Sequence, residues 1–338
     1  MANAATVPGL PRPFGKYRLV RHLARGGMGD VFLATLEGVL GFEQTLVIKT
    51  ILPELSGNPR FVEMFAAEAK TAVLLSHGNI VPIYELGEHD GVLYIAMAYI
   101  DGAPLSDLVS AARRAGAVLP HGPALHIVRQ ILEGMAYAHT GDRSRPPLVH
   151  RDLSPRNVLV ERSGQIRIVD FGIAMFAHVT EGARMGSAGY AAPEQQRAAA
   201  PDPRADVFSI GALLYELLTL EPAFSRAGVY APPDLSDIPG DVRPVIERAL
   251  ALDPERRYPD AGAFLEALAP VLARHAATTT NREVARVAEA LVFRRRPTET
   301  PTTTAIEPLE TPATAATPTA VTAATRTFAT RLPPTPVS

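Results

Sequence analysis

Eight residues in the middle of the chain, His150-Arg151-Asp152-Leu153-Ser154-Pro155-Arg156-Asn157, combine a carboxylate, an amide and two cationic side chains between short apolar segments. Asp152 could accept the proton of an attacking hydroxyl, and Asn157, five positions later, could ligate a metal ion. Residues 166–169 are typical of a β-strand and lead into Asp170-Phe171-Gly172, which supplies a second carboxylate for a divalent cation. This combination favours transfer of a phosphoryl group to a hydroxyl.

A glycine-rich turn near the N-terminus could hold the phosphates. Residues 17–20 and 31–34 alternate as strands around a turn that contains Gly26, Gly27 and Gly29. Glycines let the backbone approach phosphate oxygens closely and adopt positive φ without a steric penalty. Such a turn alone would be an ordinary hairpin, but the next strand, residues 46–49, ends in Lys49, which is placed to bind phosphate.

The elements around these residues predict a small sheet lobe. Residues 60–76 carry apolar side chains at helical spacing, and Glu68 within them is the single candidate to pair with Lys49; the alternative is an ordinary solvated glutamate. Residues 80–85 and 92–98 alternate as two more strands. The sequence thus predicts a five-stranded antiparallel sheet with one main helix.

The remainder of the folded part is expected to be mainly helical. Apolar periodicity predicts helices over residues 105–114, 123–139, 204–220, 242–252 and 260–268. The fold class is therefore α+β, with a small sheet lobe and a larger helical lobe.

Composition narrows the functional classes. The chain has 338 residues, a net charge of −2 and no cysteine, which excludes disulfides and thiolate chemistry, and it shows no long basic stripe for nucleic acid. No signal-like N-terminus and no run of 18 apolar residues is present. We expect a cytoplasmic protein without a transmembrane anchor and without nucleic acid as a partner.

From about residue 17 to 272 the chain resembles the bacterial Hanks-type Ser/Thr protein kinases, through the glycine-rich turn, Lys49, Glu68, the 150–157 loop, Asp170-Phe171-Gly172 and Ala192-Pro193-Glu194. Residues 41–43, 61–65 and 150–155 further resemble myxobacterial members. The resemblance implies a bilobal protein kinase-like fold. It also implies ATP-dependent phosphorylation of serine and threonine in protein substrates, in bacterial signalling, with autophosphorylation and self-association for it.

The resemblance also implies the role of each site residue. Asp152 would orient the acceptor hydroxyl, and Asn157 with Asp170 would hold Mg²⁺, or alternatively Mn²⁺. ATP would be bound by residues of the small lobe and the hinge at 98–100: Gly26, Gly27, Gly29, Val31, Lys49, Glu68, Met97 and Tyr99. Asp206 would brace the catalytic loop and Arg257 would pair with Glu194, both structural roles.

Two positions depart from the family pattern. Ala24 replaces the first glycine of the turn, which leaves Gly26 and Gly29 nearest the phosphates. Ser154 replaces the lysine that Ser/Thr kinases usually carry two residues after the catalytic Asp. Arg156 lies where tyrosine kinases place an arginine, so we expect Arg156 to supply the missing cation. The alternative is that Arg156 is merely solvated. The segment 186–190 still resembles a Ser/Thr-kinase platform.

The predicted organisation has five parts. They are a flexible lead-in at 1–15, the small lobe at 16–99, the large lobe at 100–275, a short basic amphipathic helix at 276–296 and a disordered Thr/Pro/Ala-rich tail at 297–338. The basic helix could dock on the large lobe or lie on an anionic membrane. Thr180 in the activation segment is the natural phosphosite, with Arg151 as the partner of its phosphate.

Two rival functions remain open at this level. A pseudokinase-like nucleotide-binding scaffold would explain Ser154 and Ala24, although these positions are peripheral to Lys49, Asp152 and Asp170. A small-molecule kinase would explain the spacing of Asp152 and Asn157, but not the Ala192-Pro193-Glu194 segment.

Overall fold

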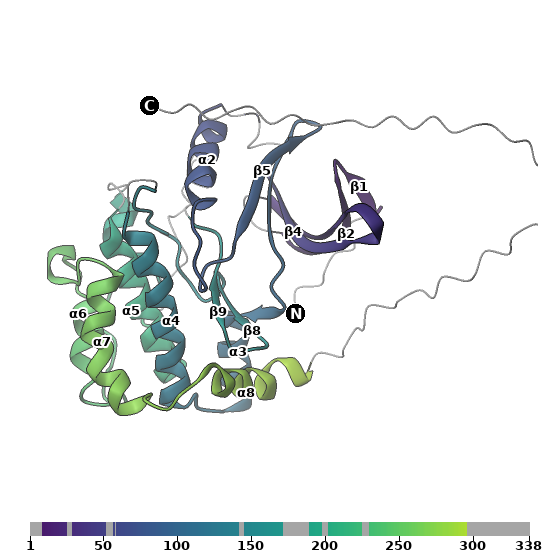
Figure 1. Ribbon diagram of the computed structural model, residues 1–338. Coiled ribbons are helices and arrows are strands. Elements are labelled where there is room, and N and C mark those ends of the chain that lie inside the picture. Colours follow the sequence, from purple (N-terminus) through teal and green to yellow (C-terminus); the bar gives the residue numbers. More distant parts are fainter. Residues whose placement is uncertain are drawn as a thin grey trace, which may run out of the picture. The chain divides into compact units, whose positions relative to one another are not determined.

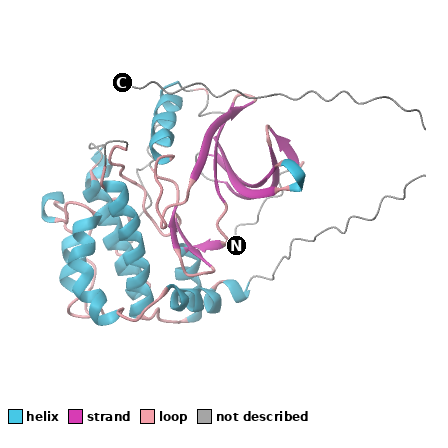
Figure 2. Cartoon of the chain, viewed as in Figure 1, coloured by secondary structure: helices cyan, strands magenta, loops and turns pink. Residues whose placement is uncertain are grey.

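The computed structural model describes residues 9–25, 29–51, 57, 59–141, 145–171, 189–197, 202–224 and 230–295. Residues Met1–Pro297 form one compact unit. In this unit one region is built mainly of strands and the other mainly of helices (Figures 1 and 2). The predicted α+β architecture is therefore confirmed.

The small lobe is a curled antiparallel sheet with the strand order β1-β2-β3-β4-β6-β5. Its strands are β1 (Arg12–Phe14), β2 (Tyr17–Arg25), β3 (Gly29–Glu37), β4 (Glu43–Ile51), β5 (Ile83–His89) and β6 (Val92–Ala98). Side chains alternate along β2, where Tyr17 and Leu19 are buried and Arg18 and Val20 are exposed. Helix α2 (Pro59–Ala72) accompanies the sheet, and η1 (Val39–Gly41) lies in the β3–β4 connection.

The sheet has six strands where the sequence predicts five. The additional strand, β1, lies in the segment expected to be a flexible lead-in, and Phe14 pairs with Tyr17 at its end. Phe14 is 7% exposed, and its ring packs edge-on against Tyr94 and His89 at centroid distances of 5.2 and 4.8 Å. The prediction of a flexible lead-in was wrong for this strand. The Ala, Pro and Gly content of residues 1–15 suggested a segment without structure, whereas one buried aromatic ring, that of Phe14, anchors the strand.

The large lobe consists of helices and one small sheet. The helices are α3 (Leu105–Ala115), α4 (His121–His139), α5 (Pro203–Thr219), α6 (Arg243–Ala249), α7 (Ala261–His275) and α8 (Asn281–Leu291), with the 3-10 turns η3 (Pro193–Arg197), η4 (Pro254–Arg256) and η5 (Phe293–Arg295). The strands β7 (Gly102–Pro104), β8 (Val158–Glu161) and β9 (Ile166–Ile168) form the small sheet.

Helix α5 lies at the centre of the large lobe. Every residue from Ala205 to Leu218 is buried, so the helix is surrounded on all sides rather than on one face. Asp206, in the first turn of the helix, is at 0% exposure, and its charge therefore needs polar partners in the interior. Within the described ranges, no helix has the length and apolar character needed to span a membrane.

Candidate active site

The buried carboxylate of Asp206 binds the backbone at the start of the predicted catalytic loop. Its Oδ2 accepts a hydrogen bond from the backbone N–H of His150 at 2.7 Å, and its Oδ1 accepts one from the backbone N–H of Arg151 at 2.8 Å. His139 on α4 lies 2.9 Å from Oδ2 through its Nε2. These bonds satisfy the buried charge and fix the start of the loop, as expected of a brace.

The backbone at Arg151 adopts a left-handed conformation with a φ of 67°. A non-glycine residue in this region is strained by about 1 kcal/mol, so neighbouring contacts must maintain it. Besides Asp206, Gln195 contributes, because its Nε2 donates to the Arg151 carbonyl at 2.6 Å while its Oε1 accepts from the Ala192 N–H at 2.8 Å. Sequence reasoning missed Gln195 and His139, and no spacing signal links either to the loop.

Asp152 and Asn157 lie next to each other as their spacing predicts. Asn157 Nδ2 donates to the Asp152 carbonyl at 2.8 Å and to Asp152 Oδ2 at 3.0 Å. The backbone of Asn157 is tied to the strand end before Asp170, because its carbonyl accepts from the Val169 N–H at 3.0 Å. Base and metal-ligand candidates are thus joined in one hydrogen-bonded unit.

Lys49 reaches the second carboxylate directly. Its Nζ lies 2.7 Å from Asp170 Oδ1, and the two side chains are 10% and 32% exposed. Asp170 has a φ of 62°, so the chain turns sharply where the carboxylate leaves β9. The backbone of Glu68 belongs to α2, but its side chain lies outside the described part, and its predicted pairing with Lys49 stays a prediction.

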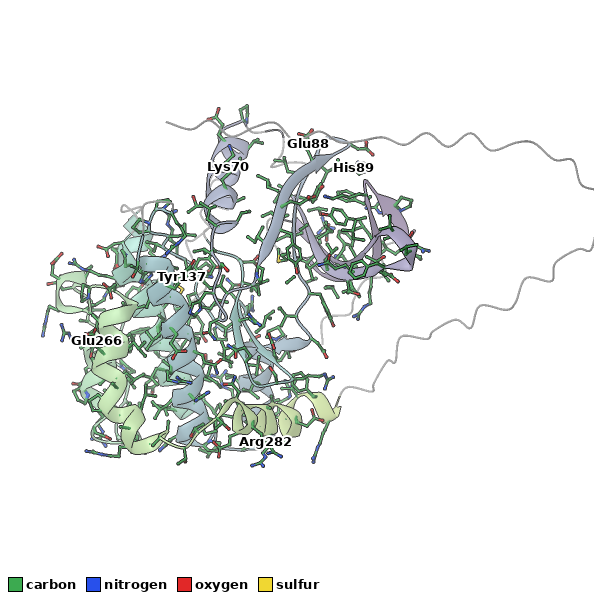
Figure 3. The ribbon with its side chains drawn as sticks, in the orientation of Figure 1. Lys70, Glu88, His89, Tyr137, Glu266 and Arg282 are labelled. Carbon is green, nitrogen blue, oxygen red and sulfur yellow. The ribbon has the colours of Figure 1, made fainter. Side chains whose placement is uncertain are left out.

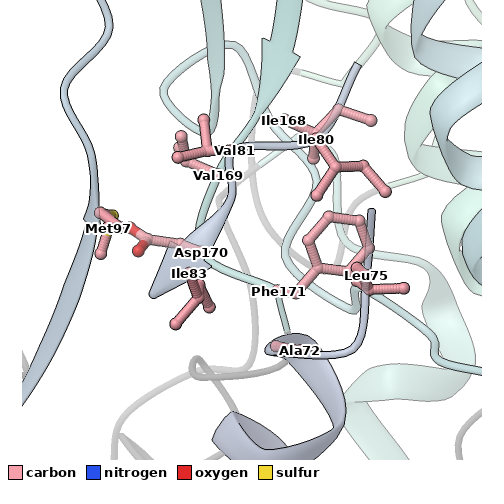
Figure 4. A pocket seen from close by; sticks show the side chains of 10 residues that line it. All are labelled: Ala72, Leu75, Ile80, Val81, Ile83, Met97, Ile168, Val169, Asp170 and Phe171. Carbon is pink, nitrogen blue, oxygen red and sulfur yellow. The ribbon is translucent and has the colours of Figure 1, made fainter. Parts of the chain in front are cut away.

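A small apolar pocket lies beside Asp170, between α2, β5, β6 and the end of β9. It is lined by Ala72, Leu75, Ile80, Val81, Ile83, Met97, Ile168, Val169, Asp170 and Phe171 (Figure 4). Met97 is 8% exposed and lines this pocket together with Asp170. Phe171 is also fixed from the loop side, since its ring centroid lies 4.8 Å from that of His150.

The donor set suits a hard divalent cation. Within the described part of the chain, the Asn157 side chain forms its hydrogen bonds through Nδ2, so its oxygen can serve as a metal ligand. Asp170 uses Oδ1 for Lys49, so its second carboxylate oxygen can also serve. An amide oxygen and a carboxylate oxygen are the ligands that Mg²⁺ prefers, usually together with phosphate oxygens. The residues therefore fit the implied metal.

The glycine-rich turn is described in part. Gly26 and Gly27 lie outside the described residues, whereas Gly29 opens β3 opposite Ile51. A β-carbon at Gly29 would lie 1.7 Å from the carbonyl oxygen of Thr50, so this glycine is required by the close approach of β4. Val31 is half-buried in β3, and Tyr99 is 38% exposed after β6.

The two unusual loop residues differ in their surroundings. Ser154 is 1% exposed, and its hydroxyl has no hydrogen-bond partner within the described part of the chain. Arg156 is exposed, and its positive charge is close enough to act on the Tyr190 hydroxyl.

The segment after residue 189 is anchored to the large lobe by buried charges. Arg257 and Glu194 form two parallel bonds of 2.6 and 2.9 Å, as the sequence suggests. The Tyr190 hydroxyl donates to the Glu216 carboxylate, which also accepts from Arg113 at 2.8 Å. Burial, together with the Glu216 charge, raises the pKa of Tyr190, so its hydroxyl stays neutral. Thr180 and Ser187 lie outside the described residues.

The Asp206 brace predicts a specific loss of stability in acid. Burial alone would raise the pKa of Asp206, but the bonds and charges of His139 and His150 outweigh it and hold the pKa below its usual range. A carboxyl with a lowered folded-state pKa stabilises the protein above its unfolded value, near 3.9, and this contribution is lost as the pH falls further. Urea unfolding of wild type and Asp206→Asn from pH 6 to 3 should give a stability difference that shrinks below about pH 4. A stability difference that stays constant from pH 6 to 3 would contradict this prediction.

Comparison with known proteins adds a family to this geometry. The protein kinase domain family matches residues 17–259. The chain is 40% identical over 295 residues to the tyrosine-protein kinase MasK of Myxococcus xanthus, covering 81% of this chain and 46% of that protein. It is 35% identical over 278 residues to the serine/threonine-protein kinase PknA of Mycobacterium tuberculosis, covering 77% of this chain and 62% of PknA.

A solved structure shows the same fold. The crystal structure of the PknI kinase domain of Mycobacterium tuberculosis superposes with a TM-score of 0.63 at 31% identity, covering 77% of this chain and 98% of that domain. The chain spans about half the length of the curated relatives it matches, 46% of MasK and 62% of PknA. The relatives share the kinase region, and their names differ in the hydroxyl that is phosphorylated.

Proposed function

The chain belongs to the protein kinase family, and from this premise we propose that it transfers the γ-phosphate of ATP to serine and threonine hydroxyls of proteins, its own chain included. The observation that carries the proposal is that two side-chain contacts bring the four predicted site residues together in pairs. Asn157 bonds the Asp152 carboxylate at 3.0 Å, and Lys49 lies 2.7 Å from Asp170. A scaffold without catalysis would not need a carboxylate base beside an amide ligand, so this geometry favours turnover.

Each residue has a task in this proposal. Asp152 accepts the hydrogen of the acceptor hydroxyl and aligns its oxygen for attack on the γ-phosphorus. Lys49 supplies a positive charge to the phosphates, and it is nearly buried, where charges interact more strongly than in water. Asn157 and Asp170 would hold Mg²⁺, which when bound neutralises phosphate charge. The Arg257–Glu194 pair keeps the acceptor platform in place.

Tyrosine phosphorylation is the second candidate. The relative MasK is named a tyrosine-protein kinase. In the loop of this chain, Ser154 replaces the lysine usual in Ser/Thr kinases, and Arg156 lies four residues after Asp152, where tyrosine kinases place their cation. Serine and threonine remain favoured, because PknA carries that name and the segment 186–190 resembles their platform. We also propose Mg²⁺ over Mn²⁺, a cytoplasmic location and self-association during autophosphorylation.

The direct test is to incubate the purified chain with labelled ATP and Mg²⁺, then identify the phosphorylated amino acids in the chain and in a generic substrate such as casein. Phosphoserine and phosphothreonine support the proposal, and phosphotyrosine alone supports the second candidate. Absence of transfer, in a protein that binds ATP, overturns both and favours the scaffold. Repeating the assay with Mn²⁺ tests the metal.

Arg156→Ala is expected to lower kcat by about 30- to 1000-fold with little change in KM for ATP, because a charge-assisted contact to the transferred phosphoryl group strengthens in the transition state. Adding Ser154→Lys to this variant should recover much of the loss, since it returns the cation usual in Ser/Thr kinases. Arg114→Ala, which removes another exposed arginine of the large lobe, is the control. Wild-type kcat in Arg156→Ala would mean that Arg156 is only solvated.

A further inference from the structure

The C-terminal segment, defined here as α8 and η5 (residues 281–295), lies beyond the part of the chain that matches the kinase family. It nevertheless belongs to the core of the large lobe, since Val284, Ala288 and Phe293 are 0%, 1% and 4% exposed. Arg282 lies on the opposite, exposed face of the helix and points away from the lobe (Figure 3). The segment is therefore docked along one face, against α3, α4 and β8.

Polar contacts of Asn281 hold the start of the segment. Asn281 Oδ1 lies 2.8 Å from His126 Nε2, and Asn281 Nδ2 donates to Gln165 Oε1 at 2.9 Å. In the turn between β8 and β9, a β-carbon on Gly164 would lie 1.8 Å from the Asn281 carbonyl oxygen. The glycine thus lets α8 approach the small sheet of the large lobe.

The end of the segment is held by Arg162, which follows β8. The guanidinium carbon lies 4.5 Å from the centroid of the Phe293 ring, and Nη1 lies 3.6 Å from Glu289 Oε2. The same residue reaches Asp101, because its backbone N–H donates to the Asp101 carbonyl at 3.1 Å and its side-chain Nε lies 3.2 Å from Asp101 Oδ2. One arginine therefore contacts both the C-terminal segment and Asp101.

Asp101 follows directly on residues 98–100, the predicted hinge for adenine. After it, β7 pairs with β8, which itself begins one residue after Asn157. The pairing is tight, because a β-carbon on Gly102 would lie 2.4 Å from the Val160 carbonyl oxygen. A shift of Arg162 would therefore displace the hinge at residues 98–100 and the start of β8 next to the metal-ligand candidate Asn157.

We propose that the C-terminal segment is a positioning element of the nucleotide site and that Arg162 transmits its position to the hinge. This inference rests on the proposed ATP-dependent function. The decisive contacts are the stacking of the Arg162 guanidinium on Phe293, which both test variants below remove, and the bond from the Arg162 backbone N–H to the Asp101 carbonyl, which they keep. The ion pairs contribute less, because Arg162, Asp101 and Glu289 are 44%, 66% and 45% exposed and water screens such charges.

The test uses the full chain as wild type, Arg162→Ala and Phe293→Leu, which keeps the apolar burial but removes the ring face. The control is Arg274→Ala, which breaks another exposed ion pair, with Asp241 at 3.0 Å, remote from the hinge in sequence. Amide hydrogen exchange of residues 98–104 is measured without nucleotide, and KM for ATP and kcat are measured with Mg²⁺. Both test variants should exchange faster at 98–104 and raise KM about 3- to 30-fold with a smaller effect on kcat, unlike the control.

The two readouts separate this inference from the function on which it rests. If wild type transfers no phosphate, the proposed function fails, while hydrogen exchange at 98–104 still tests the link from Arg162 to the hinge. Exchange and KM in both test variants equal to those of Arg274→Ala would overturn the inference. A lower kcat together with a lower free energy of unfolding, at an unchanged KM for ATP, would also overturn the inference, since this result would indicate a merely structural role.

Discussion

Asp170→Asn is expected to lower the rate of phosphoryl transfer by on the order of 1000-fold while leaving the fold intact. The substitution removes the anionic ligand proposed for the metal and the partner of Lys49, which lies 2.7 Å away. Asn is nearly isosteric with Asp, and it tolerates the left-handed backbone that the φ of 62° requires. The effect on activity therefore comes from the lost charge rather than from backbone strain, which an alanine would add.

Labelled-ATP transfer and thermal unfolding measured on the same preparation test this prediction. Asp237→Asn, on an exposed loop of the large lobe, removes one carboxylate elsewhere and should leave both quantities unchanged. Activity of Asp170→Asn within tenfold of wild type would show that this carboxylate is not a necessary ligand.

Asp206→Asn is expected to destabilise the protein by about 3–5 kcal/mol, the usual result of breaking a buried charged network. The carboxylate accepts from the backbone of His150 and Arg151 and contacts His139. An amide can accept with only one atom, so its NH₂ group would face a donor in a site that is 0% exposed. The strained backbone at Arg151 would lose one of its supports, and activity should fall as well.

Urea unfolding gives the free-energy change, and Asp202→Asn serves as the matched control. Asp202 caps the N-terminus of the same helix, where its side chain accepts from the Arg204 N–H, and it is 43% exposed. Because Asn caps a helix about as well as Asp, the control should cost less than about 1 kcal/mol. Equal effects of the two substitutions would mean that the buried network is not a special source of stability.

Much of the site follows from local sequence. Asp152 and Asn157 are five positions apart in one loop, and a 3.0 Å bond joins their side chains. Lys49 and Asp170 could also be placed on or directly after strands, because period-two alternation marks strands, although β4 continues two residues past Lys49 to Ile51. The all-round apolar character of residues 205–218 similarly indicates a buried helix.

The tertiary structure alone decided which distant groups meet. Lys49 contacts Asp170, 121 positions away, and Gln195 supports Arg151 from 44 positions away. Neither pairing leaves a periodic signal in the chain, because the partners lie on different elements whose relative placement depends on packing. The strand at Arg12–Phe14 escaped the sequence for the same reason, and the sequence left open whether the helix at 281–291 docks on the large lobe or lies on a membrane. Sequence patterns report which face of an element is apolar, whereas the surface against which that face packs is set by the whole core.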